Sequence, residues 1–307
     1  MLQVSEEFIQ TIVEVHGERG WVWISQLPAI LDSCAQQWRV TLGPPFPNLS
    51  YNYVAPAIRA DGAAVVIKAC PSSEMESEFQ AQVAALDWYG GHGAVQLLAV
   101  DAAQAVMLLE RLEPGTLLST VEDDAEATSI AAGVMRNLWR TGAAGQDLPT
   151  VADWGEGFVR LRARYGGGSG PLRPQLLDAA ERLYAELSAA AAAPVVLHGD
   201  LHQYNIMRGE RRGWLAIDPK GLIGEPAYEI GAFLRNCLPE PLPNDAAARL
   251  TERRVQQFAA ELTIDRARVR GWGLAQAVLS AWWSLEDHGH GWEPMAALAE
   301  ILLAMKE

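Results

Sequence analysis

The 307-residue sequence predicts an α+β fold with two lobes, a small antiparallel β lobe followed by a larger, mainly helical lobe. Two observations point to this arrangement. Strand-like segments, with apolar runs or alternating apolar and polar residues, are concentrated between residues 51 and 109. Beyond residue 115, apolar residues mostly recur every three or four positions, which is the period of a helix. A chain of this length is large enough to bury a core in each lobe.

The elements of the first lobe follow from local signals. The first forty residues have helical periodicity, interrupted between Gly17 and Gly20, and a Pro-rich extended linker follows at 43–47. An Asp61-Gly62 pair, typical of a two-residue hairpin turn, separates two strand-like runs. The remaining expected elements are a strand over 63–70, a helix over 73–88, and strands over 95–100 and 105–109.

The second lobe is predicted to be built from helices. Two strand-like segments, 194–197 and 213–218, interrupt them and are expected to form an embedded hairpin around a polar loop. The lobes are expected to be residues 1–112 and 113–307, with a hinge near 109–115. The helices are expected over 119–141, 151–164, 172–193, 225–237, 245–262, 266–287 and 293–306.

Charge and cysteine content exclude several classes of protein. Lys and Arg number 24 against 38 Asp and Glu, a net charge of −14, whereas nucleic acids and anionic membranes attract basic surfaces. We therefore expect no nucleic-acid or membrane partner and a small, cationic substrate. Three scattered cysteines without a CxxC pair disfavour a disulfide framework or a zinc knuckle. The N-terminus lacks a signal-peptide pattern and no apolar run could span a membrane, which predicts a cytoplasmic protein.

One loop carries the residues expected to do chemistry. It runs from His198 through Asp200 to Asn205 with the spacing H-x-D-x-x-x-x-N, and the next strand ends in Asp218. This is the spacing of a kinase catalytic loop, in which a carboxylate orients the acceptor hydroxyl and takes its proton. Asp200 is therefore the expected base. Asn205 and Asp218 offer hard oxygen ligands and are the expected Mg²⁺ site, and His198 is expected to brace the loop.

The first lobe supplies candidates for binding ATP. Lys68 ends an apolar strand and is expected to pair with the phosphates. Glu74, Glu76 and Glu78 near the start of the following helix are candidates to hold it, and Glu78 is the first choice. Lys68, Lys220 and Lys306 are the only lysines in a chain whose other cations are arginines. Lys220 follows Asp218 by two residues and is a candidate either for contact with phosphate or substrate or for bracing the loop. The expected hinge contacts with adenine are Glu110 and Leu112.

Together these residues resemble the aminoglycoside phosphotransferase family of kinase-like enzymes, and most closely its streptomycin 6-phosphotransferase and hydroxyurea phosphotransferase branch. The resemblance covers nearly the whole chain and includes segments 50–56, 93–98, 108–112, 198–205, 217–221 and 224–229. It implies a bilobal protein-kinase-like fold with a nucleotide-binding first lobe and a catalytic, acceptor-binding second lobe. It also implies ATP and Mg²⁺, and transfer of phosphate to a hydroxyl of a small antibiotic. Streptomycin, at its 6-position, is the first expectation, with inactivation of the antibiotic as the result.

Three positions depart from the family pattern. No G-x-G-x-x-G motif covers the phosphates, and the loop 47–53 offers Asn52 in its place. Gln82 stands where the family usually has a glutamate, so that Glu78, one turn earlier, becomes the expected partner of the lysine. Glu229 stands where the family commonly has an aspartate that supports the catalytic loop, and its longer side chain has to reach the same loop.

The acceptor is expected to lie against the second lobe. The expected contacts are His202 of the catalytic loop, Glu225 and Tyr228 of the segment after Asp218, and Glu286 and Asp287 at the end of the 266–287 helix. Three tryptophans lie near the last two, and carboxylates with aromatic rings suit a cationic group, although core packing explains the tryptophans equally well. Zinc binding by the histidines of the loop or of 288–290 lacks a third ligand nearby.

Two alternatives stay open at this point. One keeps the fold and changes the acceptor to hydroxyurea, another aminoglycoside or a metabolite. The other is a catalytically silent kinase-like binding protein, which the departures at Gln82 and Glu229 allow and the complete set of expected catalytic and metal residues disfavours. The sequence does not decide between ATP and GTP, and it leaves the oligomeric state open.

Overall fold

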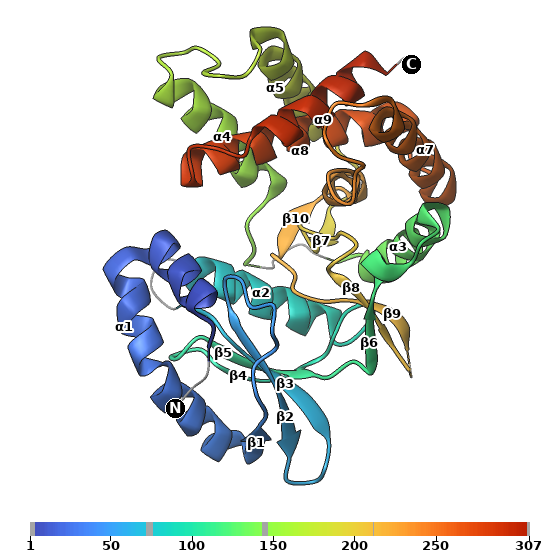
Figure 1. The fold of residues 1–307 in the computed structure, drawn as a ribbon. Coiled ribbons are helices and arrows are strands. Elements are labelled where there is room, and N and C mark those ends of the chain that lie inside the picture. The colour runs from blue at the N-terminus through green and yellow to red at the C-terminus, as the bar shows by residue number, and fades with distance from the viewer. Residues whose placement is uncertain (1–3, 72–75, 143–146, 211, 306–307) are drawn as a thin grey trace.

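A computed structural model describes residues 4–71, 76–142, 147–210 and 212–305. The described chain forms two lobes, a small antiparallel sheet with flanking helices and a larger helical lobe, so the predicted fold class is confirmed (Figure 1). Lys306, Glu74 and the predicted helix ends at 73 and 306 lie outside the described residues. No helix among the described residues combines the length and the apolar character that a membrane crossing needs.

The first lobe is organised around an antiparallel five-stranded sheet with the order β1-β2-β3-β5-β4. The hairpin predicted at Asp61-Gly62 joins β2 to β3, which pair from Tyr53 opposite Ala69 to Ile58 opposite Ala64. The strands are β1 (Val40–Leu42), β2 (Tyr53–Arg59), β3 (Ala64–Ala69), β4 (Leu97–Asp101) and β5 (Val106–Glu110).

Helix α1 (Glu6–Trp38) covers one face of this sheet (Figure 1). It is bent at Gly17, whose φ of 58° and ψ of −136° are not helical, as the predicted interruption requires. Because the bend folds the helix back on itself, both halves bury apolar side chains against the sheet. Those of the helix are Phe8, Ile12, Trp23, Leu27, Leu31 and Cys34, and those of the sheet are Tyr53, Ala55, Ile67, Ala69 and Val106.

Helix α2 (Glu76–Tyr89) packs tightly against the segment that follows Asp218 in the second lobe. Gly221 makes this possible: a Cβ at this position would lie 2.4 Å from the carbonyl oxygen of Ala81, and φ is +75°. Only glycine accommodates both the conformation and the close approach. The position of α2 is therefore fixed relative to the second lobe as well as to the sheet.

Helix α8 forms the centre of the second lobe and packs against α4, α5, α6, α7 and α9. It buries side chains along its whole length, Trp272 and Trp282 among them. Of the three tryptophans predicted near the acceptor, Trp282 is a core residue, and Trp283 and Trp292 are partly buried against that core. The helices are α3 (Asp124–Leu138), α4 (Val151–Arg164), α5 (Pro174–Ala189), α6 (Ile230–Leu234), α7 (Asp245–Leu262), α8 (Arg266–Asp287) and α9 (Glu293–Ala304).

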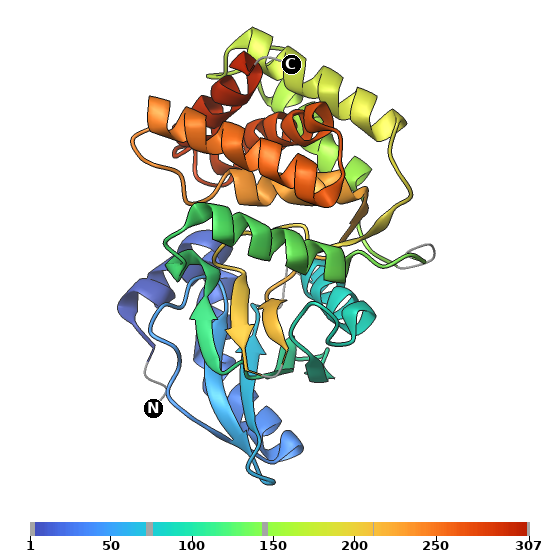
Figure 2. The ribbon, with the colours of Figure 1, turned by 90° about the vertical axis from the view of Figure 1, so that its right-hand side faces the viewer.

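The predicted embedded hairpin is wrong in its pairing. Strand β7 (Val195–Leu197) pairs with β10 (Leu222–Gly224), whereas β9 (Gly213–Ala216) pairs with β8 (Ile206–Gly209). Strand β6 (Pro114–Leu117), within the predicted hinge, adds to β8. These strands have three or four residues, too few to show a period in the sequence. Figure 2 shows the hairpin of β8 and β9 beside the first sheet, to which Ala216 is bridged through Ala94.

Candidate active site

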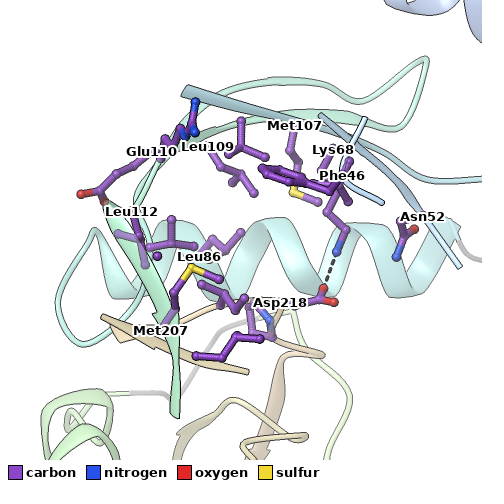
Figure 3. A pocket seen from close by; sticks show the side chains of 18 of the residues that line it. Phe46, Asn52, Lys68, Leu86, Met107, Leu109, Glu110, Leu112, Met207 and Asp218 are labelled. Atoms are coloured by element: carbon purple, nitrogen blue, oxygen red, sulfur yellow. Dashed lines mark hydrogen bonds and ion pairs between the residues drawn. The ribbon is translucent and has the colours of Figure 1, made fainter. Parts of the chain in front are cut away.

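A cleft between the lobes brings together most of the predicted nucleotide contacts. Its cavity of about 460 Å³ is lined by the first lobe and by Met207, Ile217 and Asp218 of the second. Figure 3 shows the hinge residues Glu110 and Leu112 at one end and polar side chains at the other. Between the two ends the lining is apolar, with Val66, Leu86, Val95, Met107, Leu109 and Met207.

Lys68 provides a buried cation at the polar end of the cleft. Its side chain extends from β3, is only 5% exposed, and donates hydrogen bonds to Gln82 Oε1 at 2.8 Å and to a carboxylate oxygen of Asp218. Burial by itself lowers the pKa of Lys68, but the neighbouring Asp218 carboxylate outweighs this and raises the pKa above its usual value. The ammonium is therefore charged and fixed at the position where phosphates would enter.

The expected pairing of Glu78 with Lys68 is wrong. Glu78 Oε2 lies 3.5 Å from Nζ of Lys220, and the α2 side chain that bonds Lys68 is Gln82. The two α2 positions are four residues apart and lie on one face, one turn from each other, so only one of them meets β3. The α2 partner of Lys68 therefore stays at position 82 and does not shift one turn to Glu78. At position 82 a neutral amide takes the place of the usual carboxylate.

His198 braces the catalytic loop as a neutral ring. Its Nε2 lies 2.7 Å from the carbonyl oxygen of Ile217, and the backbone N–H of Asp200 donates to its Nδ1 at 3.2 Å. Because Nδ1 accepts, the ring proton is on Nε2 and is donated to that carbonyl. Burial lowers the pKa of His198 to about 4, in agreement with the neutral form. The ring thus ties the loop to Ile217, which follows β9 and precedes Asp218.

Glu229 holds the backbone of the same loop in place. Its carboxylate accepts the backbone N–H of His198 at 2.6 Å and that of Gly199 at 2.9 Å, so the longer side chain does reach the loop. The side chain is buried, and burial raises the pKa of Glu229 to about 7. Two buried backbone donors that would otherwise have no partner are satisfied by one carboxylate.

Asp200 has charged neighbours that keep it ionised. Its Oδ1 accepts a hydrogen bond from Nη2 of Arg235 at 2.5 Å, and its Oδ2 lies 3.6 Å from Nε2 of His202. Burial alone would raise the pKa of Asp200, but His202 and the Arg235 guanidinium hold it well below its usual range. The carboxylate is therefore an anionic hydrogen-bond acceptor, suited to orienting a hydroxyl group.

Asn205 and Asp218 are brought side by side by the backbone. The N–H of Ile217 donates to the carbonyl of Asn205 at 2.9 Å, which places the next residue, Asp218, beside it. Asn205 uses its amide nitrogen to bond the carbonyl of Asp200 at 2.9 Å, and its amide oxygen receives no hydrogen bond from the described residues. Asp218 has a left-handed backbone, with φ of 60°, that only a constrained loop maintains in a residue other than glycine.

At the hinge, the side chain of Glu110 is already engaged. It accepts hydrogen bonds from Arg212 and from the backbone N–H of Gln96, and the backbone N–H of Glu110 donates to the Gln96 carbonyl at 2.9 Å. Leu112 lines the cleft with its side chain, as does Asn52 from the loop after β1. The structure thus places all three predicted residues at the cavity, with Glu110 anchoring the end of β5.

The predicted acceptor residues do not form one site. Glu225 and Tyr228 are buried, so these two assignments are wrong: the Glu225 carboxylate is held by Arg268 and Trp272, and Tyr228 packs edge-on against Trp272. Both side chains fix the segment after β10 to α8 and cannot reach a ligand. By contrast, His202 lies beside Asp200, Asp287 is exposed, and Glu286 is paired with Arg160 at 2.8 Å.

Two further residues near Asp200 were not predicted. Arg235, at the end of α6, contacts the carboxylate of Asp200, and Trp154 of α4 lies 3.4 Å from the position that a Cβ on Gly199 would take. Each comes from a helix distant in sequence, so no local motif marks either one. Within the described residues no three His, Cys, Asp or Glu side chains cluster as a metal site.

A family model described as aminoglycoside/hydroxyurea antibiotic resistance kinase matches residues 43–288 of this chain. The chain belongs to this family. Two curated relatives agree over nearly its whole length: the streptomycin 6-kinase of Streptomyces glaucescens is 30% identical over 98% of this chain and 97% of its own, and the hydroxyurea phosphotransferase of Kitasatospora aureofaciens is 31% identical over 99% and 86%. The chain is accordingly a phosphotransferase that acts on hydroxyl groups.

A solved structure supports the fold. The aminoglycoside phosphotransferase APH(4)-Ia, in a ternary complex with ADP and hygromycin B, superposes with a TM-score of 0.61 at 13% identity and covers 88% of this chain and 97% of its own. At that identity the likeness concerns the fold alone. A kinase-like fold of this kind implies ATP as the phosphoryl donor.

Proposed function

We propose that this protein transfers the γ-phosphoryl group of ATP to a hydroxyl of an aminoglycoside, with the 6-hydroxyl of streptomycin as the first acceptor, and so inactivates the antibiotic. The observation that supports the proposal is the series of hydrogen bonds that links Lys68 to Asp218 and Asn205 to Asp200 and Ile217, from the cleft to the catalytic loop. The two streptomycin 6-kinases of Streptomyces among its relatives, each 30% identical, support the choice of acceptor.

Asp200 is the proposed base. Its ionised carboxylate, oriented by Arg235, would accept a hydrogen bond from the acceptor hydroxyl and take its proton as the bond to phosphorus forms. The backbone bonds from His198 and Gly199 to Glu229 hold the loop so that this carboxylate keeps its place. Geometry of this kind supplies much of the rate in phosphoryl transfer, because the protein acts mainly by positioning and electrostatics.

The residues of the cleft fit ATP and Mg²⁺. The apolar middle of the cavity suits a purine, and the Lys68 ammonium suits the phosphates. The free amide oxygen of Asn205 and the Asp218 carboxylate are the hard oxygen donors that Mg²⁺ prefers, so these two residues would hold it. When bound, Mg²⁺ neutralises the charge that develops on the phosphate oxygens.

The acceptor side favours a cation. A second cavity of about 450 Å³ adjoins the catalytic loop, with Trp154, Asp147 and the ion pair of Glu78 with Lys220 in its wall. Burial raises the pKa of Asp287, and the Glu286 and Glu78 carboxylates act in the same direction. An indole face beside carboxylates attracts the guanidinium and ammonium groups of an aminoglycoside. The net charge of −14 acts in the same direction.

Hydroxyurea is the second candidate acceptor. The relative from Kitasatospora aureofaciens named for this activity covers 99% of the chain, slightly more than the streptomycin 6-kinase from S. glaucescens. Hydroxyurea is small and uncharged, so it would need neither Trp154 nor the carboxylates around it. Replacement of Trp154 by alanine therefore separates the two: it should raise KM for streptomycin and leave KM for hydroxyurea unchanged.

An acceptor panel tests the proposal. Purified protein with Mg²⁺ and ATP is assayed for ADP release with streptomycin, hydroxyurea and other aminoglycosides, and each acceptor is examined by mass spectrometry. The proposal predicts streptomycin-stimulated ADP release and a streptomycin product heavier by one phosphoryl group. Stimulation by hydroxyurea alone would favour the second candidate, and no stimulation by any aminoglycoside would refute the first.

A further inference from the structure

The backbone of Lys220 lies beside the start of the loop that carries Asp200, two residues after Asp218. Its backbone N–H donates to the carbonyl of His198 at 2.8 Å, which fixes it to the start of the catalytic loop. Its Cβ lies 3.2 Å from the position that a Cβ on Gly199 would take, and Asp200 is the next residue. Asp218 precedes Lys220 by two residues, and the ammonium is among the charges that lower the pKa of that carboxyl, after Lys68. The side chain therefore starts beside the point of transfer.

The ammonium of Lys220 is held loosely, unlike that of Lys68. Its ion pair with Glu78 spans 3.5 Å, and the two side chains are 39% and 49% exposed. Ion pairs with this exposure contribute little to stability and exchange easily. Lys68, in contrast, is buried and bonded to both Gln82 and Asp218. Of the two cations, Lys220 is the one that can change partner during a reaction cycle.

The substitution at Gln82 explains why Glu78 has this partner. A carboxylate at position 82 would lie against Lys68, where the amide oxygen now accepts at 2.8 Å. Because the Gln82 amide is neutral, it does not compensate the positive charge of Lys68. That charge interacts with Asp218 and, in the proposed reaction, with the phosphates. The carboxylate of Glu78, one turn earlier on α2, instead meets Lys220. Helix α2 thus holds a second cation beside the catalytic loop instead of neutralising the first.

We propose that Lys220 is a further catalytic residue, whose ammonium leaves Glu78 and contacts the transferred phosphoryl group. The inference rests on the proposed function. In the transfer, the acceptor oxygen bonds to the γ-phosphorus as the bond to the bridging β–γ oxygen breaks. ADP leaves with that electron pair, and the hydroxyl proton passes to Asp200. Lys220 stabilises the negative charge on the oxygens of the transferred phosphoryl group. This interaction is strongest in the transition state.

Paired substitutions test the role of Lys220. K220Q removes the ammonium and should lower kcat by roughly 100-fold, with the Kd of ADP, measured by calorimetry, changed less than threefold. E78Q frees the same ammonium from its partner and should lower kcat far less than K220Q does. K220R should recover part of the loss, because it restores a cation. R182Q, which removes a cation from an exposed ion pair on α5, is the matched control and should keep wild-type kcat.

The outcomes separate this inference from the proposed function. Equal losses of kcat in K220Q and E78Q would show a structural ion pair and overturn the inference, as would a K220Q defect confined to nucleotide Kd. If wild-type protein phosphorylates no acceptor, the proposed function fails, and the same variants are compared by Mg²⁺-dependent hydrolysis of ATP, in which water replaces the acceptor. In this assay the inference is overturned if K220Q hydrolyses ATP as fast as the wild type. It is also overturned if the wild type does not hydrolyse ATP.

Discussion

Glu229 is a buried carboxylate on which the catalytic loop rests, and Glu229→Gln removes its charge with little change of shape. The glutamine offers one acceptor oxygen where the carboxylate offers two, so either the His198 or the Gly199 N–H faces an amide NH₂ group. A buried donor left without an acceptor costs about 1–3 kcal/mol. Against this loss, the substitution also removes the cost of keeping a charge at a buried site.

The balance between these two effects depends on pH in a predictable direction. Burial raises the pKa of Glu229 from 4.5 to about 7, so the folded state binds a proton more tightly than the unfolded state does. The stability contributed by this proton is fully present below pH 4.5 and is lost as the pH rises through 7. For these two pKa values the linkage relation gives a loss of about 2.5 kcal/mol between pH 5 and pH 8. The glutamine variant has no such titration.

Urea denaturation of both proteins at pH 5 and pH 8 measures this difference. We expect Glu229→Gln to be destabilised by about 1–3 kcal/mol at pH 5, and by about 2.5 kcal/mol less at pH 8, where the two effects nearly cancel. Turnover should fall at both pH values because the loop loses a support. Glu186→Gln, at an exposed site on α5, is the control and should show no pH-dependent difference. A Glu229→Gln effect of equal size at both pH values would refute the reasoning.

Three further substitutions test other parts of the site. Arg235→Gln removes the guanidinium that holds the pKa of Asp200 down, so the acid limb of the kcat profile should move to higher pH; an unmoved limb would show that Arg235 does not act on Asp200. Gly221→Ala places a Cβ 2.4 Å from the carbonyl of Ala81 and should cost about 1–3 kcal/mol of stability, measured by urea denaturation; wild-type stability would contradict the close approach. Lys68→Met should raise KM for ATP at least tenfold, and an unchanged KM would remove Lys68 from the phosphate site.

Much of the fold could be predicted because long helices show their period in a single stretch of sequence. A glycine likewise marks a bend at its own position. Helices α4, α7 and α8 begin and end where their periodicity does, and the bend in α1 occurs at Gly17. The strands of three or four residues in the second lobe were mispaired, because their partners are chosen by tertiary packing. The 225–237 segment became a 3₁₀ turn and the short helix α6 for the same reason.

The part of the candidate site that could be predicted is the part whose residues lie near one another in the sequence. His198, Asp200 and Asn205 lie in one loop, and Asp218 follows strand β9, so their spacing in the sequence indicates their arrangement. Arg235 and Trp154 reach the loop from separate helices, which spacing cannot reveal.

Similar limits explain the wrong assignments. Glu78 and Gln82 occupy one helix face, and only packing decides which of them meets Lys68. Glu225 and Tyr228 follow Asp218 closely in the sequence, but packing against α8 buries both.

Turnover of the Asp200→Ala variant tests the central claim most directly. Wild-type and variant proteins are compared for ADP release with Mg²⁺, ATP and streptomycin, after circular dichroism and urea denaturation have shown that the variant is folded. The account predicts that streptomycin-stimulated turnover in the wild type is lost in Asp200→Ala, while the Kd of ADP stays within a few-fold, because Asp200 lies on the acceptor side of the cleft. Near-normal turnover by a folded Asp200→Ala protein would contradict the assignment of the catalytic loop.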